Sequence, residues 1–227
     1  AFIVSSGIKR GIEKVTKYFM PILFIILVVL VIWATTLSGA WEGYKTFLLK
    51  FDFAELRNPQ TIRNAFTQAF FSLSLGIGIM VTYASYLNKK SNLPKLSISV
   101  ASLDTLVGLM AGLITFPIVL TFGLSEAISE STVGALFISI PTGLGSYGAA
   151  GRVVAVAFFA LAYIAAITSS VSLLEVPVSS LMDKFGFQRG KSVWIITLFL
   201  FLAGIPSALN LNILGTVDSI FGGVLLI

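Results

Sequence analysis

The sequence contains no cysteine and no histidine among its 227 residues. Their absence excludes a disulfide framework, a zinc site of the usual ligand types and any catalytic triad built on His or Cys. Charged residues are also scarce, at 11% of the chain, and the formal net charge is +5. The basic residues lie in short segments between apolar runs and form no single basic stripe, so we predict no nucleic-acid partner.

Apolar residues make up 56% of the chain, and the mean hydropathy is +0.98. This composition predicts a multi-pass membrane protein in contact with lipid. We expect it in the plasma or inner membrane. Basic residues are more frequent on one side of the predicted spans, which indicates the cytoplasmic side and makes residues 38–64 and 123–150 extracellular loops. We expect a single transmembrane domain over 1–227, with spans at about 18–37, 65–87, 96–122, 153–182, 192–209 and 211–227, the last truncated.

The predicted span 65–87 contains Ser72, Ser74, Gly76 and Gly78 at its middle. Serine and glycine are poor helix formers, and here they lie where a membrane helix needs to be most stable. This pattern predicts a helix that breaks at Ser72 to Gly78. Unpaired backbone groups are costly in hydrocarbon unless they line a cavity, so the break is a candidate binding site for ions and a small polar solute.

Asp104 lies in the middle of the predicted span 96–122. An Asp at the centre of a membrane helix costs about 2.5–3.5 kcal/mol on insertion scales, so it should face a partner, a cavity or a cation. The alternative is a protonated Asp that is hydrogen-bonded to a neighbouring helix. Glu175 lies nearer the inner end of its span, and both a functional role and contact with interfacial water remain open for it.

The hydroxyl triplet Thr168-Ser169-Ser170 lies at the middle of the span 153–182. Hydroxyls in membrane helices most often bond back to a carbonyl of their own helix, and small residues most often permit close helix packing. Beside a broken helix and a buried Asp, the same triplet offers hard oxygen ligands of the kind that a sodium ion prefers.

The segment FFSLSLGIG at Phe70 to Gly78, followed by TYASY at Thr82 to Tyr86, closely resembles the sixth transmembrane helix of the neurotransmitter:sodium symporter family. Broken helices at the bilayer midplane are an established feature of this family. The resemblance covers nearly the whole chain, with 9–32, 103–116, 135–148 and 165–183 similar to the fifth helix, seventh helix, fourth extracellular loop and eighth helix. It implies an internal fragment of a bacterial or archaeal member, about helices 5 to 10 of a leucine-transporter-like inverted-repeat fold, whose partners include the missing helices.

The resemblance also implies roles for individual residues. A first sodium site would include Ser72 and Asp104. A second would include the carbonyl of Ala165 together with Thr168 and Ser169. The substrate pocket would be lined by Phe71, Ser72, Ser74, Ile77, Ser169 and Leu173. Tyr86 and Asp183 match positions of the cytoplasmic gate, and Asp218 matches the extracellular gate.

The implied function is sodium-coupled symport of a small neutral amino acid, apolar or aromatic, by alternating access. The fragment alone is expected to be inactive, and its oligomeric state is left open. Well-studied members often carry Asn at the position of Asp104, and chloride-dependent animal members carry Ser at the position of Gly108. In those chloride-dependent members, chloride provides a negative charge near the first sodium site. Because Asp104 would supply that charge here, we expect transport to require Na+ but not chloride.

Two alternatives belong to other classes. The first is an enzyme, an intramembrane aspartyl protease that uses Asp104 and Asp218. Such enzymes carry one Asp in a Gly-x-Gly-Asp context, whereas Gly76-Ile77-Gly78 is followed here by Ile79, so we predict no enzymatic activity. The second is a structural or degenerate helix bundle whose polar residues only pack. Sodium-dependent thermal stabilisation would distinguish the symporter from this bundle.

Overall fold

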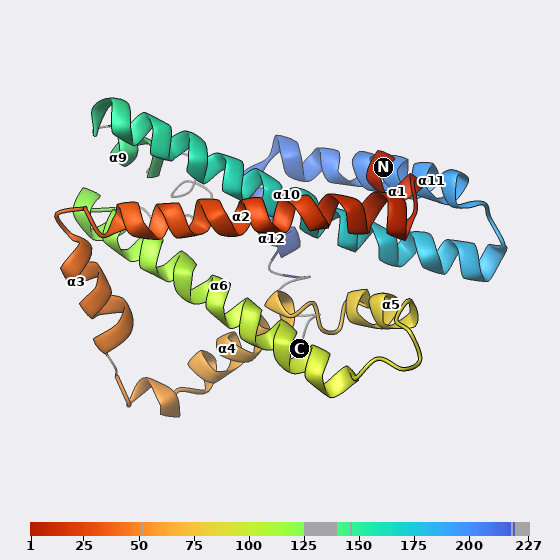
Figure 1. The fold of residues 1–227 in the computed structure, drawn as a ribbon, viewed down its shortest axis with the longest axis horizontal. Helices are drawn as coiled ribbons and strands as arrows, with labels where there is room; N and C mark the ends of the chain where they lie inside the picture. The colour runs from red at the N-terminus through yellow and green to blue at the C-terminus, as the bar shows by residue number, and fades with distance from the viewer. Residues whose placement is uncertain (51, 125–139, 146, 219, 221–227) are drawn as a thin grey trace. The chain divides into compact units, whose positions relative to one another are not determined.

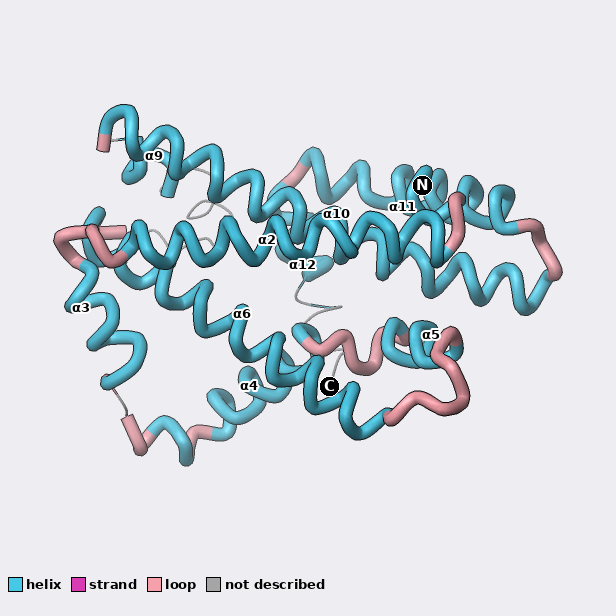
Figure 2. Tube along the Cα trace, viewed as in Figure 1, coloured by secondary structure: helices cyan, strands magenta, loops and turns pink. Residues whose placement is uncertain are grey.

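The computed structural model describes residues 1–227 except 51, 125–139, 146, 219 and 221–227. Figure 2 shows that the described residues form helices and loops, with no strand among them. This confirms the predicted all-α class. The α-helices labelled in Figure 1 are α1 (Phe2–Ser5), α2 (Glu13–Ala34), α3 (Ala40–Tyr44), α4 (Pro59–Ser72), α5 (Ile79–Ser85), α6 (Leu93–Phe122), α9 (Ile140–Gly145), α10 (Gly148–Phe185), α11 (Arg189–Leu209) and α12 (Leu211–Asp218). Short π-helical turns cover Ile8–Ile12 and Lys45–Leu49, and a 3₁₀ turn covers Glu55–Arg57.

Four of the described helical stretches are long and apolar enough to cross a membrane, namely Ile8–Ala34, Leu93–Phe122, Gly148–Phe185 and Arg189–Leu209. They overlap the runs expected at 18–37, 96–122, 153–182 and 192–209. The helices and the apolar runs end at different residues. An apolar run shows which residues suit the hydrocarbon layer, whereas capping and turn residues determine where a helix ends. The placement of each span in a membrane, the single domain and the sidedness of the loops stay predictions.

The predicted break lies where the sequence placed it. α4 ends at Ser72 and α5 begins at Ile79, and Figure 1 shows the non-helical stretch between them. Three residues of this stretch have left-handed backbone angles, Ser74 at φ 55°, Gly76 at φ 81° and Gly78 at φ 82°. Glycine adopts these angles without a steric penalty, so this sequence can end one helix and start another within a few residues.

Two other predicted segments are described only in part. α12 covers the start of the run 211–227, and residues 219 and 221–227 lie outside the described residues. The predicted loop 123–150, with the segment 135–148 similar to the fourth extracellular loop, includes 125–139 and 146, which also lie outside them. In the predicted loop 38–64, where residue 51 is not described, the start of α4 is defined by Asn58, whose side chain accepts a hydrogen bond from the Gln60 amide at 3.0 Å.

The chain forms two compact units, and the second comprises Tyr18–Asp52 and Ser102–Ala166. Its buried core consists of Leu27, Leu30, Leu37, Ala40, Ile114, Ile118 and Leu144. The amide of Gly39 donates to Thr121 Oγ1 at 3.0 Å. Gly43 packs so closely on α6 that a Cβ there would lie 2.6 Å from the Pro117 nitrogen. Within this unit, glycines therefore let the α3 segment lie directly against the α6 backbone.

The first unit comprises Ala1–Lys17, Phe53–Ala101 and Ile167–Ile227. Its buried apolar core consists of Val4, Ile12, Val171, Leu174, Val178 and Val193. Residues from α1, the turn before α2, α10 and α11 therefore share one core. Glu175 and Ser192 are also fully buried in this unit, so polar groups are present in its interior as well. This unit contains both parts of the broken helix.

Candidate functional site

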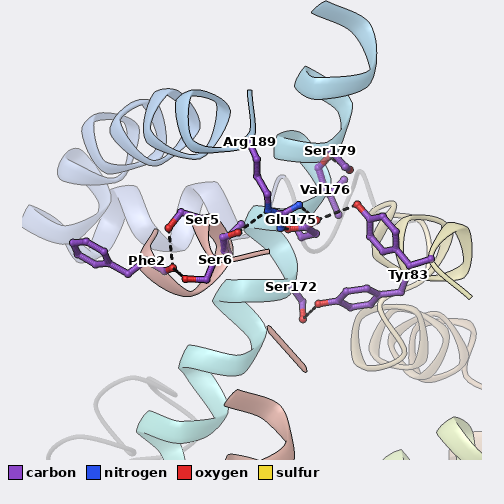
Figure 3. A network of polar contacts seen from close by, with 11 residues as sticks. Phe2, Ser5, Ser6, Tyr83, Ser172, Glu175, Val176, Ser179 and Arg189 are labelled. Carbon is purple, nitrogen blue, oxygen red and sulfur yellow. Dashed lines mark hydrogen bonds and ion pairs between the residues drawn. The ribbon is translucent and has the colours of Figure 1, made fainter. Parts of the chain in front are cut away.

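Two tyrosines, Tyr83 in α5 and Tyr86 directly after it, donate hydrogen bonds to side chains of α10. Tyr83 Oη donates to Ser172 Oγ at 2.8 Å, and Tyr86 Oη donates to Glu175 Oε1 at 3.0 Å. The residues are three apart on both segments, a spacing that places side chains on one helix face. Figure 3 shows Tyr83 and Ser172 pointing toward each other. The half-helix after the break is therefore joined to α10 at two successive positions.

Glu175 is fully buried and is the centre of an ionic network. Arg189, the first residue of α11, donates from Nη1 to Glu175 Oε1 at 3.0 Å and from Nη2 to Oε2 at 2.5 Å. Arg189 Nε also donates to the Val4 carbonyl at 2.8 Å. Figure 3 shows the arginine side chain extending between α1 and Glu175. The bidentate pair compensates the cost of burying a carboxylate, and it ties α1, α10 and α11 to Tyr86.

This network was only partly visible in the sequence. The sequence leaves two interpretations open for Glu175, a functional role or contact with interfacial water. In the structure its side chain is fully buried and paired with Arg189. In the sequence, Arg189 is one of several basic residues between two apolar runs. The available signal was a carboxylate inside an apolar run with an arginine at the start of the following run, because a buried charge needs a partner.

The two hydroxyl residues of the predicted second sodium site lie one after the other on α10. Thr168 is buried, at 7% exposure, and Ser169 is exposed. One turn further along, Ser172 Oγ donates to the Thr168 carbonyl at 3.1 Å. Thr168 is therefore connected through Ser172 to Tyr83 on the half-helix after the break. Leu173, a predicted pocket residue on the same helix, is 51% exposed.

The remaining pocket residues surround the break. Phe71 and Ser72 are the last two residues of α4 and are exposed, whereas Ser74 and Ile77 lie in the unwound segment and are partly buried. The Leu75 amide donates to the Phe70 carbonyl at 2.8 Å, which closes the last turn of α4. Beyond that turn, the left-handed residues direct the backbone out of the helical path. The break thus presents peptide groups and short hydroxyl side chains together.

The structure places each of the other predicted site residues in a helix. Asp104 is a partly buried residue of α6, and Ala165 is a partly buried residue of α10; both belong to the second unit. Asp183 is exposed in the last turn of α10, and Asp218 is the last residue of α12. The carboxylate that receives the Tyr86 hydrogen bond is Glu175. The roles assigned to all of these residues stay predictions.

A family model described as the sodium:neurotransmitter symporter family matches residues 1–214. A sodium-dependent transporter of Haemophilus influenzae, named as uncharacterized, is 40% identical over 97% of this chain and 47% of its own length. A sodium-dependent nutrient amino acid transporter of Drosophila ananassae is 32% identical over 84% of this chain and 31% of its own length. The chain thus spans less than half the length of these curated relatives.

The crystal structure of MhsT in complex with L-phenylalanine is similar to this chain with a TM-score of 0.86 at 41% sequence identity. The match covers 99% of this chain and 53% of that protein. The similarity to this structure and the match to the family model point to the same family. The predicted leucine-transporter-like fold with a broken helix is therefore confirmed, as part of a larger arrangement of helices.

Proposed function

Because the chain belongs to the sodium:neurotransmitter symporter family, we propose that it forms part of a transporter that couples the uptake of a small neutral amino acid to sodium. The complete transporter comprises this chain and the further helices that the family fold requires. It works in the plasma or inner membrane, and the chain alone does not transport. The proposed function is not enzymatic, in keeping with relatives that are named as transporters.

The observation that carries this proposal is the interruption between α4 and α5. In hydrocarbon, peptide groups that leave a helix cost several kcal/mol each unless they are satisfied, so an unwound segment is stable only where it meets other protein or lines a cavity. The left-handed backbone angles of Ser74, Gly76 and Gly78 keep this segment out of the helical conformation. The freed peptide groups can then bind the polar backbone of an amino acid.

Sodium is the proposed co-transported ion, and hydroxyl and carbonyl oxygens bind it. Ser72 and Asp104 contribute to a first site. The Ala165 carbonyl, Thr168 and Ser169 contribute to a second. Thr168 supports the second assignment, because its position is buried and its helix carries three successive hydroxyl residues at mid-length. Hard oxygen ligands without nitrogen or sulfur suit an alkali cation.

The proposed substrate is an amino acid with an apolar or aromatic side chain. Phe71, Ile77 and Leu173 present apolar surface, and Ser74 and Ser169 supply hydroxyls near the substrate backbone. A charged side chain among these residues would be buried without a partner, at a cost of several kcal/mol. The relative MhsT was crystallised with L-phenylalanine, and the Drosophila relative is named as a nutrient amino acid transporter, which supports this class.

Alternating access requires gates on both sides of the pocket. Tyr86 and Asp183 belong to the proposed cytoplasmic gate, and Asp218 belongs to the proposed extracellular gate. Tyr86 donates a hydrogen bond to the buried Glu175, so its side chain has a fixed partner on α10. Sodium favours one arrangement only if it binds that arrangement more tightly than the other.

The decisive experiment measures uptake by the complete transporter in proteoliposomes under an imposed sodium gradient. We expect radiolabelled phenylalanine or leucine to accumulate with sodium and not with potassium, and Lys, Arg, Asp and Glu to compete poorly. Changing Thr168 and Ser169 together to Ala should abolish the sodium dependence. Ser180→Ala is the control, because Ser180 is exposed on the same helix and its hydroxyl donates a local bond to the Val176 carbonyl.

Either of two results would contradict the proposal. Sodium-independent uptake in the unmodified protein would remove the coupling, and strong preference for a charged amino acid would remove the pocket assignment. A structural helix bundle would show neither uptake nor a rise in melting temperature with sodium.

A further inference from the structure

The bond between Tyr83 and Ser172 connects two elements to which the proposed function gives separate tasks. Tyr83 lies on α5, directly after the break that would hold the substrate. Ser172 lies on α10, one turn after the proposed sodium ligand Thr168. The Tyr83 hydroxyl donates to Ser172 Oγ at 2.8 Å, and Ser172 Oγ donates to the Thr168 carbonyl at 3.1 Å.

Resting on the proposed function, we propose that Tyr83 and Ser172 are a positioning pair for the second sodium site. They fix the α10 backbone at Thr168 relative to the half-helix after the break. The affinity for sodium then depends on where that half-helix lies. Neither residue is a ligand of the ion; each acts through the backbone that presents the Thr168 hydroxyl.

The directions of the two successive hydrogen bonds, from Tyr83 to Ser172 and from Ser172 to Thr168, support this role. A serine hydroxyl has one proton to donate, and Ser172 uses it on the Thr168 carbonyl, which leaves its oxygen to accept from the tyrosine. Bonds in such a chain polarise and strengthen one another in a site of low dielectric. Figure 3 shows the Tyr83 ring extending to Ser172, so the contact runs through a rigid side chain.

A serine that bonds to the carbonyl four residues earlier usually has only a local effect on its own helix. Ser180 is an example within α10, because it donates to the Val176 carbonyl at 3.0 Å on an exposed face. Ser172 makes the same local bond and also receives a side chain from another helix. This difference makes Ser180 a matched control for the hydroxyl chemistry.

The Tyr86 contact one turn away differs in kind. It reaches Glu175, which is buried and paired with Arg189, so breaking it disturbs a charged network. The Tyr83 contact joins two neutral hydroxyls that can be removed as Tyr83→Phe and Ser172→Ala with little change of shape. The two variants therefore test the positioning role without leaving a buried charge unpaired.

The test measures binding of radioactive sodium to the purified complete transporter. Tyr83→Phe and Ser172→Ala should each raise the half-saturating sodium concentration about three- to tenfold, the range expected for one hydrogen bond. The double variant should resemble Ser172→Ala, because that change alone already removes the bond to Tyr83 as well as the bond to Thr168. Ser180→Ala should bind sodium as the unmodified protein does. The melting temperature without sodium should be similar in all four variants, which separates positioning from a general loss of stability.

Unchanged sodium affinity in Tyr83→Phe and Ser172→Ala, while the unmodified protein binds sodium, would overturn this proposal and leave the proposed function standing. Additive effects in the double variant, or an equal effect of Ser180→Ala, would also overturn it. Absence of sodium binding by the unmodified protein would instead contradict the proposed function, and the positioning role with it.

Discussion

Arg189 binds both carboxylate oxygens of Glu175, at 3.0 and 2.5 Å, and the glutamate side chain is fully shielded from solvent. A buried pair of this kind contributes little compared with well-packed apolar residues, but removing one partner leaves an uncompensated charge. The pair therefore makes the stability of this region depend on both residues at once.

Arg189→Ala should destabilise the complete transporter by about 3–5 kcal/mol, because it leaves the Glu175 carboxylate buried with Tyr86 as its remaining partner among the described residues. A double change of Glu175→Leu and Arg189→Met should cost much less, because no charge then stays buried. Thermal unfolding in detergent measures both. If the single variant unfolds at the same temperature as the double variant, the pair is not buried as the structure describes it.

The left-handed backbone at Gly78 predicts that a side chain there lowers the stability of the protein. Gly78 has φ 82°, and a Cβ there would lie 3.1 Å from Val176 Cγ1. Gly78→Ala should therefore destabilise the protein by about 1–3 kcal/mol through left-handed strain and crowding. Gly204→Ala in α11 is the control, because no described residue lies within 4 Å of a Cβ at that position and alanine favours the helix. Equal melting temperatures for the two variants would argue against the break.

The break and the buried ion pair show what the sequence could and could not predict. The break depends on local chemistry, since serine and glycine at 72–78 disfavour a helix wherever the rest of the chain lies. The pairing of Glu175 with Arg189 depends on how α11 returns beside α10, and hydropathy contains no information on that register. The partner of Tyr86, Glu175, likewise comes from a distant part of the chain, and the gate role of Tyr86 stays a prediction.

The apolar runs and the observed helices end at different residues, for a related reason. α10 continues to Phe185, beyond the expected end of its apolar run at 182, and ends where Gly186 takes φ 65°. A glycine at this position ends a helix through its backbone freedom, which a hydropathy pattern does not record. Asp104 shows the complementary case, because its position in a span was clear while its role stays a prediction.

Tyr44 predicts an effect of pH on stability. Its hydroxyl is buried and has no hydrogen-bond partner among the described residues, and burial raises the pKa of Tyr44 above its ordinary value of 10.0. The unfolded chain therefore loses this proton first as pH rises above 10, so the folded state loses stability there. Tyr44→Phe should be at least as stable as the unmodified protein at pH 7, because it removes an unsatisfied polar group.

The stability advantage of Tyr44→Phe should grow as the pH rises above 10. Tyr18→Phe is the control, because Tyr18 is 59% exposed and its hydroxyl can reach water or the lipid headgroups. Melting temperatures from pH 7 to pH 11 measure the difference. A constant gap between the Tyr44 variant and the unmodified protein across this range would contradict the burial of the hydroxyl.

The last prediction is that transport does not require chloride. Asp104 would place a fixed negative charge beside the proposed first sodium site, where chloride-dependent members of the family rely on the bound anion. Uptake should therefore be unchanged when gluconate replaces chloride. Changing Asp104→Asn and Gly108→Ser together should create a chloride requirement, and the described part of the structure has room for the serine because none of its atoms lies within 4 Å of a Cβ at Gly108. The single variant Gly108→Ser should stay independent of chloride, since Asp104 keeps its charge. Loss of uptake by the unmodified transporter in gluconate would show that Asp104 does not replace the anion.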